Sequence, residues 1–258
     1  GDQGNSFRSH KHECRPPKAP RSPRSIVAKM TNIPEERIVP WAAARSIFGA
    51  SVAINGFHEK IPKLVPELLP NGRIAIGQKG LVFKDASLLQ AIETGFSMPD
   101  LFPMLKNPLS AFETITILKK IARLYERDRP GLENLVAIFR AGLESLAVFA
   151  NHDPASRELL SGDSQELVLF KLANSEPLGW LRSSSEGVFS VGTGFIDGKP
   201  SVVLTFSSTQ VAFDAVVHGI DQLGAPAKGE VEIQGKIPLM DKLGYVSRIA
   251  LEKVPMPR

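Results

Sequence analysis

The sequence predicts an α+β fold, in which a mainly helical region precedes a C-terminal part of alternating strands and helices. Between Val188 and Val246 the spacing of apolar residues changes from every second residue to every third or fourth and back again. These two periods are typical of half-buried strands and of amphipathic helices. We therefore divide the chain into a tail over residues 1–25, a mainly helical region over 26–165 and a C-terminal domain over 166–258.

Two strands joined by a tight turn are expected in the C-terminal domain, over residues 188–196 and 199–207. The turn is Asp197-Gly198, a dipeptide that readily supplies the positive φ values of a two-residue hairpin loop. Side chains of a strand point alternately to its two faces, so the second strand has one apolar face. That face consists of Val202, Leu204 and Phe206.

A helix is expected directly after the second strand. Ser207 followed three residues later by Gln210 fits a capping box, in which each side chain binds a backbone N–H group at the helix start. Phe213, Val217 and Ile220 then recur at helical spacing. The sequence thus predicts an amphipathic helix with one apolar stripe.

A further strand and a final helix complete the domain. Residues 230–234 alternate strictly between polar and apolar side chains, and Gly235 ends the strand. Pro238 suits the first position of a helix, because no hydrogen bond within the helix is needed from that residue. The apolar stripe of this helix consists of Leu239, Leu243 and Val246.

Three short segments resemble the sterol-carrier-protein-2 family of lipid-binding domains. They are Val203-Leu204-Thr205-Phe206 running into a helix, Lys228-Gly229-Glu230-Val231-Glu232-Ile233-Gln234-Gly235-Lys236, and the amphipathic Leu239-Met240-Asp241-Lys242-Leu243. The family often shows a Gly-Lys-Leu-x-Ile-x-Gly run before its last helix, and here Glu230 and Val231 take the Lys-Leu places. The resemblance covers residues 167–258.

The resemblance implies a curved, mixed or antiparallel sheet with helices on one face and an apolar tunnel between them. The family carries no catalytic set, and its members range from lipid carriers to accessory domains of enzymes. The expected function is therefore non-catalytic binding or transfer of a lipid-like hydrophobic molecule. The side chains expected to line the tunnel are Leu204, Phe206, Phe213, Val217, Ile233, Leu239 and Leu243.

Each of these side chains fits plain core packing as well, so two other functions stay open. The domain would act as an accessory or assembly factor that presents an apolar substrate to a partner enzyme, or as an interaction scaffold whose cavity is filled by its own side chains. A co-purifying enzyme favours the first alternative. A packed interior without a tunnel favours the second.

The region before the C-terminal domain is expected to be mainly helical, with one short hairpin over residues 73–83. Residues 38–57 predict a helix that packs on a soluble core. They do not predict a membrane span, because Arg45, Asn55 and many small residues interrupt the apolar run.

Two apolar stripes in the middle of the chain predict a pair of long helices. The first stripe starts with Leu109 and Phe112, and the second runs from Leu132 to Phe149. A short turn joins them, so the helices are expected to pack on each other with both stripes in the core. Residues 98–105, which carry two prolines, are expected to bury their leucines.

The charge of the chain is concentrated in its first 25 residues. These hold six lysines and arginines and two acidic residues, which accounts for the whole formal net charge of +4. The remaining chain has no basic excess, so nucleic acid is not an expected partner. The tail is rich in proline and serine and is expected to be disordered, either as a solvated leader or in transient contact with a membrane surface.

No residue pattern predicts catalysis or a cofactor. His152-Asp153 is a pair found in metal-dependent phosphohydrolases, but those enzymes need further histidine and aspartate ligands. Asp153-Pro154 is explained more simply as a helix N-cap followed by proline at the first helical position. The chain is therefore not expected to be an enzyme.

The tail also contains His10, His12 and Cys14, three potential metal ligands without a fourth. Since zinc sites in proteins normally use four ligands, no metal is expected. Cys14 is the only cysteine, so no internal disulfide can form. A reducing compartment, and hence a cytoplasmic location, is expected.

Overall fold

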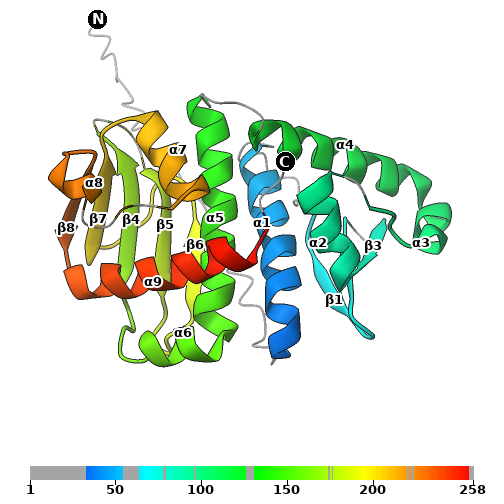
Figure 1. Cartoon of the computed structure of the whole chain (residues 1–258), viewed down its shortest axis with the longest axis horizontal. Helices are drawn as coiled ribbons and strands as arrows, with labels where there is room; N and C mark the ends of the chain where they lie inside the picture. The colour runs from blue at the N-terminus through cyan, green and yellow to red at the C-terminus, as the bar shows by residue number, and fades with distance from the viewer. Residues whose placement is uncertain are drawn as a thin grey trace, which may run out of the picture. The chain divides into compact units, whose positions relative to one another are not determined.

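A three-stranded sheet and a five-stranded sheet organise the part of the chain that the structure describes (Figure 1). The computed structural model describes residues 33–54, 64–77, 80–95, 97–125, 131–173, 175, 177–219, 221 and 224–255, all within one unit, Ile33–Arg258. The basic tail lies outside these residues, and so do Cys14, both tail histidines and Ile220.

The first sheet is antiparallel, with the strand order β1-β2-β3. Two helices precede its strands, and a third follows them directly. In chain order these elements are η1 (Glu35–Arg37), α1 (Ile38–Ile54), β1 (Glu67–Leu69), β2 (Arg73–Ile76), β3 (Leu81–Lys84) and α2 (Asp85–Thr94). β2 and β3 form the short hairpin predicted over residues 73–83. Arg37 ties η1 to the sheet, because its guanidinium donates to Asp85 at 2.7 Å and to the carbonyl group of Leu69 at 2.9 Å.

The second sheet has five strands in the order β6-β5-β4-β7-β8. β4 and β7 run parallel, and every other neighbouring pair runs antiparallel. The strands are β4 (Leu167–Leu172), β5 (Pro177–Ser183), β6 (Phe189–Gly192), β7 (Val202–Phe206) and β8 (Val231–Gly235). The predicted α+β class with a mixed C-terminal sheet is confirmed.

The β-hairpin expected around Asp197-Gly198 is wrong. β6 pairs with β5 at one edge of the sheet, and β5 and β4 both lie between β6 and β7. Gly198 does adopt a positive φ of 121°, but in a connection that crosses these two strands. A turn dipeptide specifies only the local backbone, whereas strand pairing depends on which apolar faces can be buried together. β4 and β5, which the periodicity did not reveal, supply those faces.

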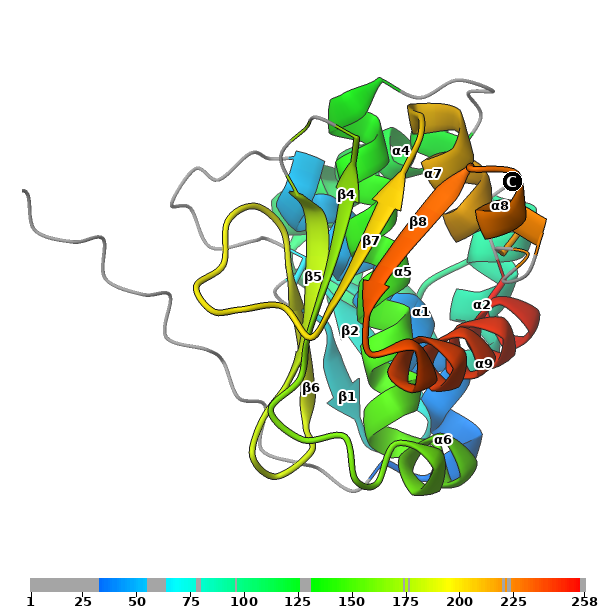
Figure 2. The same ribbon diagram turned by 90° about the vertical axis from the view of Figure 1, so that its left-hand side faces the viewer.

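Helices cover one face of the five-stranded sheet (Figure 2). They are α5 (Leu132–His152), α7 (Thr209–Val217) and α9 (Ile237–Lys253), joined to the strands through the short helices α6 (Pro154–Leu159) and α8 (Gly224–Ala227). The alternation along β7 agrees with this arrangement. Its inner side chains Val202, Leu204 and Phe206 are buried, and its outer side chains Val203 and Thr205 are half-buried.

α5 is packed between the five-stranded sheet and α1, which runs along it (Figure 1). Small residues permit the close approach of the two helices. A Cβ atom added at Gly49 would lie 2.7 Å from Cγ of Glu144 and 2.9 Å from the carbonyl oxygen of Arg140. α5 precedes residue 166 and yet shares its core with the sheet, so the expected domain boundary stays a prediction.

The expected pairing of two long helices along their apolar stripes is wrong. α4 (Pro108–Tyr125) runs across α1, and α1 is the main helical neighbour of α5 (Figure 1). α4 buries Ala111, Thr114, Ile121 and Leu124. Leu109 and Phe112, expected in the core, are 82% and 71% exposed.

The short helix α3 (Leu101–Lys106) also differs from the expectation. Leu101 and Leu105 are 57% and 79% exposed, so the prediction that this segment buries its leucines is wrong. The physical reason is the same in α3 and α4. An apolar stripe shows which side of a helix would gain from burial, but burial also requires another element on that side.

Candidate functional site

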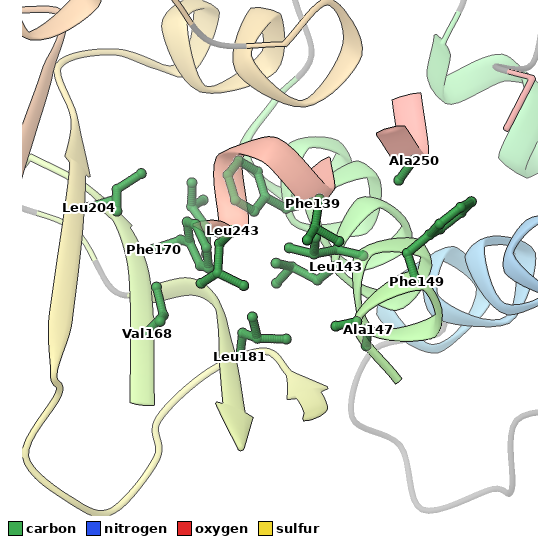
Figure 3. Packing of buried hydrophobic residues seen from close by; sticks show 14 of the residues in the cluster. Phe139, Leu143, Ala147, Phe149, Val168, Phe170, Leu181, Leu204, Leu243 and Ala250 are labelled. Atoms are coloured by element: carbon green, nitrogen blue, oxygen red, sulfur yellow. The ribbon is translucent and has the colours of Figure 1, made fainter. Parts of the chain in front are cut away.

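One apolar layer fills the space between the inner face of the five-stranded sheet and helices α5, α7 and α9; we call it the inner layer. The register of the sheet sets its first half. Phe170 lies opposite Leu204, and Val168 lies between Leu181 and Val202. All five side chains are buried, and Val168, Phe170, Leu181 and Leu204 point toward α5 (Figure 3).

The helices supply the second half of the inner layer, and α5 contributes its centre. The ring centroid of Phe139 lies 5.7 Å from that of Phe170 and 5.5 Å from that of Phe206, in tilted and edge-on contacts. A Cβ atom at Gly179 of β5 would lie 2.7 Å from Cδ1 of Leu143, so the glycine lets α5 approach the sheet closely. The centre of the layer is therefore occupied by the protein's own side chains.

The structure brings all seven predicted tunnel residues into this one cluster. Five are buried, namely Leu204, Phe206, Phe213, Leu239 and Leu243. Val217 on α7 and Ile233 on β8 are half-buried and pack against the same cluster. Their role as ligand walls stays a prediction.

Sequence reasoning missed the contribution of α5 and β4 to the layer. The sequence shows the apolar stripe that contains Phe139 and Leu143, but it predicts that this stripe packs against the preceding helix and not against the sheet. The apolar residues of β4 gave no clear period, since five of its six residues from Leu167 to Leu172 are apolar. Its first four residues are all apolar, and such a short continuous run is typical of a central strand and could have indicated it.

A cluster of ion pairs fastens the N-terminal end of α9 to the chain segment before β4. Nζ of Lys236 lies 2.8 Å from Oδ1 of Asp163 and 2.8 Å from Oε1 of Glu166. Nζ of Lys242 lies 2.7 Å from Oδ2 of Asp163. The backbone carbonyl group of Asp163 also accepts a hydrogen bond from Oγ of Ser183, at 2.8 Å. This buried aspartate therefore links α9, β5 and the loop before β4.

The ion pairs shift the pKa values of Asp163, Glu166 and Lys236. Burial on its own would raise the pKa of Asp163, but the hydrogen bonds from Lys236 and Lys242 outweigh it and lower the pKa. The hydrogen bond from Lys236 lowers the pKa of Glu166. The two carboxylates in turn raise the pKa of Lys236. All of these groups are charged at neutral pH, and α9 is held by charge as well as by apolar contact.

The cap of α7 is one residue later than the capping box predicted. Oγ of Ser208 accepts a hydrogen bond from the backbone N–H of Val211, at 3.2 Å. The N–H of Ser207 donates to the carbonyl group of Glu230, so Ser207 still belongs to the strand pairing of β7 and β8. Gln210, expected to close the box, donates to Asp214 instead.

The predicted cap at Asp153 is confirmed. Its Oδ2 accepts hydrogen bonds from the N–H of Ser156 at 2.9 Å and from the Ser156 hydroxyl group at 2.7 Å, and Pro154 begins α6. Burial, and then the nearby Arg157, lower the pKa of His152. Across the described residues no group of histidine, cysteine, aspartate and glutamate side chains could hold a metal ion.

A polar hollow of about 530 Å³ lies beside the ends of β4 and β5. Two of its polar side chains, Ser184 and Arg182, hold loops. Oγ of Ser184 accepts from the N–H groups of Glu186 and Val188, and Arg182 donates to the carbonyl group of Asp197.

The fold and the inner layer define an α+β protein with a one-sided mixed sheet over an apolar interior. Neither a family model nor a curated protein matches the chain. Among the described helices, none is both long and apolar enough to cross a membrane.

Several solved structures are similar to part of the chain. A sterol carrier protein domain of Helicoverpa armigera shares 22% identity, covers 45% of this chain and 91% of its own length, and has a TM-score of 0.35. The UbiJ-SCP2 ubiquinone synthesis protein shares 18% identity over 41% of this chain and 88% of its own, with a TM-score of 0.33. Apo sterol carrier protein 2 of Yarrowia lipolytica shares 17% identity over 47% of this chain and 90% of its own, with a TM-score of 0.28. These matches are to the family that the C-terminal motifs resemble.

Proposed function

We propose that the C-terminal region binds one lipid-like hydrophobic molecule in the inner layer, by burial and without covalent chemistry. The observation that carries the proposal is the convergence of the seven expected wall residues, from β7, β8, α7 and α9, on one continuous apolar cluster. Buried charges of the described chain lie elsewhere. Glu144 faces α1, Asp153 caps α6 and Asp163 anchors α9.

Burial of an acyl chain supplies enough free energy for useful affinity. Each methylene group transferred from water to an apolar site contributes about 0.8 kcal/mol, so few polar contacts are needed. Because Phe139, Phe170 and Phe206 fill the centre of the layer, the ligand must separate the helices from the sheet. α9 is suited to move, since its ion pairs with Asp163 involve only its N-terminal part and leave the rest of the helix held by apolar residues such as Val246 and Ala250.

Native mass spectrometry of the delipidated full chain, mixed with a panel of fatty acids and phospholipids, tests this proposal. We expect a discrete mass increase that corresponds to one bound molecule and disappears after organic extraction. Phe213→Trp adds volume inside the inner layer and should reduce uptake. Phe195→Trp is the matched control, because Phe195 is 86% exposed on the connection between β6 and β7. Wild-type protein that takes up no lipid would contradict the proposal.

A second function is favoured by the ring contacts of Phe139. An inner layer that stays filled by its own side chains would serve as the rigid core of an interaction scaffold. Phe139→Ala distinguishes the two functions, because it removes the ring that touches both Phe170 and Phe206. Uptake of small apolar ligands by this variant alone, and not by the wild-type chain, would support the scaffold.

A further inference from the structure

An exposed apolar surface lies on α3, the segment before it and the start of α4; we call it the α3–α4 patch. It consists of Met98, Leu101, Phe102, Leu105, Leu109 and Phe112, which are 57–82% exposed. Soluble proteins scatter such residues singly, and a run of them within fifteen residues marks an interaction surface. The patch lies outside the inner layer and needs no cavity, so it extends beyond the function proposed above.

The patch belongs to a longer exposed stripe of α4 whose character changes along the helix. Leu109 and Phe112 occupy its first turns, and Lys119, Lys120 and Arg123 follow at helical spacing, all exposed. The opposite side of α4 is the buried one. One side of α4 thus presents apolar side chains at its N-terminal end, then the acidic Glu113, and three cations toward its C-terminal end.

The charge around the patch is mainly basic. Residues 98–125 contain four lysines and arginines and two acidic residues. One of the acidic residues, Asp100, lies 3.6 Å from Arg73, which compensates its charge. Lys106, at the end of α3, is exposed beside the apolar side chains. The surroundings of the patch therefore complement a negatively charged partner.

We propose that the α3–α4 patch docks on the surface of an anionic lipid bilayer. Phe102, Leu105 and their apolar neighbours would enter the boundary between headgroups and acyl chains. Lys106, Lys119, Lys120 and Arg123 would lie near the lipid phosphates. Helices with an apolar face and adjacent basic residues bind such interfaces through burial of the apolar side chains and through attraction of the basic ones to anionic lipids.

The geometry favours a bilayer over a protein partner. Phe102, Leu105 and Leu109 are exposed by roughly four-fifths (78%, 79% and 82%), so these side chains protrude from the surface. A protein partner would need hollows matched to each protruding side chain, whereas a bilayer interface accommodates them without a fixed shape. The adjacent basic residues distinguish anionic bilayers from neutral ones.

Flotation of the full chain with vesicles tests this inference. Phosphatidylcholine vesicles with and without phosphatidylglycerol are compared at low and high salt. We expect binding to the anionic vesicles that weakens as salt rises. The double variant Phe102→Ser with Phe112→Ser should lower the partition coefficient by about tenfold or more. Lys119→Glu with Lys120→Glu should lower it by a similar factor on anionic vesicles only.

Matched control variants separate the patch from the rest of the molecule. Phe195→Ser and Lys228→Glu alter exposed residues elsewhere and should leave vesicle binding unchanged. Binding that persists in both patch variants would place the contact in another segment, such as the basic residues 1–25, and would overturn the inference.

Two further measurements complete the test. Sedimentation equilibrium without lipid detects self-association. A wild-type dimer that the serine variants dissociate, together with absent vesicle binding, would identify the patch as a contact between two copies and would contradict bilayer docking. Phe213→Trp should keep full vesicle binding even where it loses lipid uptake. The bilayer inference and the proposed ligand function can therefore fail separately.

Discussion

The inner layer and the α3–α4 patch are both built from leucine and phenylalanine, yet one is covered and the other is not. Phe139 of α5 is 3% exposed, and Phe112 of α4 is 71% exposed, although both belong to apolar stripes of similar appearance in the sequence. The difference lies in their neighbours. α5 has the five-stranded sheet on one side and α1 on the other.

Within the described residues, α4 packs on other elements through one side only. That side buries Ala111, Thr114, Ile121 and Leu124, and the opposite side carries two residues of the patch, Leu109 and Phe112, and the basic residues. Helical periodicity therefore indicates only where apolar surface gathers on a helix. Whether that surface is part of the core or available to a partner depends on the surrounding elements.

The largest expected effect on stability comes from a substitution in the inner layer, and the matching substitution in the α3–α4 patch should have almost none. Phe139→Ala should lower the free energy of unfolding by about 3–5 kcal/mol, because it leaves a cavity among buried rings. Phe112→Ala should change it by no more than about 0.5 kcal/mol, since the ring is already in solvent. Urea unfolding of both variants measures the difference. Equal losses would contradict the distinction between a covered layer and an exposed patch.

A comparable loss of stability is expected from a substitution at the interface between α1 and α5. Glu144 is buried and accepts from Arg45 at 2.5 Å and from Arg140 at 2.6 Å. Glu144→Ala leaves two guanidinium groups partly desolvated and should destabilise the fold by about 3 kcal/mol. Glu158→Ala on α6 is the control, because that side chain is exposed and its loss should matter little. A small effect of Glu144→Ala would mean that the ion pairs add little to the packing of α1 on α5.

A smaller loss of stability, which depends on pH, is expected when the ion pairs between Asp163 and α9 are removed. Asp163→Asn should destabilise the protein by about 1–2 kcal/mol at neutral pH, because both lysines remain partly solvated. A carboxylate whose pKa is lowered in the folded protein stabilises the fold above its unfolded pKa, about 4, and loses this contribution as pH falls through the folded pKa.

Unfolding free energies of wild type and Asp163→Asn, measured from neutral pH down to acid, check this prediction. The wild-type stability should fall below about pH 4, and the variant should show a shallower decline. On the alkaline side Lys236, whose pKa is raised, should keep its contribution up to at least its unfolded pKa, about 10.5, and lose it above that. Parallel curves for the two proteins would show that Asp163 does not contribute to the acid dependence.

The smallest stability effect distinguishes the two serines at the start of α7. Ser208→Ala removes the side chain that caps the helix and should lower stability by about 1 kcal/mol. Ser207→Ala should have a smaller effect, because Ser207 takes part in strand pairing through its backbone. Thermal unfolding of the two variants compares them directly, and a larger loss for Ser207→Ala would restore the capping box predicted from the sequence.

Much of the local structure could be predicted from the sequence, because it depends on residues close together in the chain. The alternation of β8, the buried stripe of Leu239, Leu243 and Val246 in α9, and the cap at Asp153 all agree with the structure. The seven expected wall residues likewise fall in one cluster. Their periodicity alone assigns them to inward faces.

Long-range pairing could not be predicted in the same way. The position of β7 between β4 and β8 contradicts the local hairpin signal of Asp197-Gly198, and the shift of the α7 cap from Ser207 to Ser208 follows from that pairing. The contribution of Phe139 to the inner layer also depended on contacts with strands that come later in the chain.

The sequence by itself determined the α+β class and the inward faces of β7, β8 and α9, since each of these depends on residues a few positions apart in the chain. Only the tertiary structure decided the strand order, the central place of α5 and the exposure of the α3–α4 patch. The physical reason is that burial is a property of pairs of surfaces, and the second surface of each pair comes from a distant part of the chain.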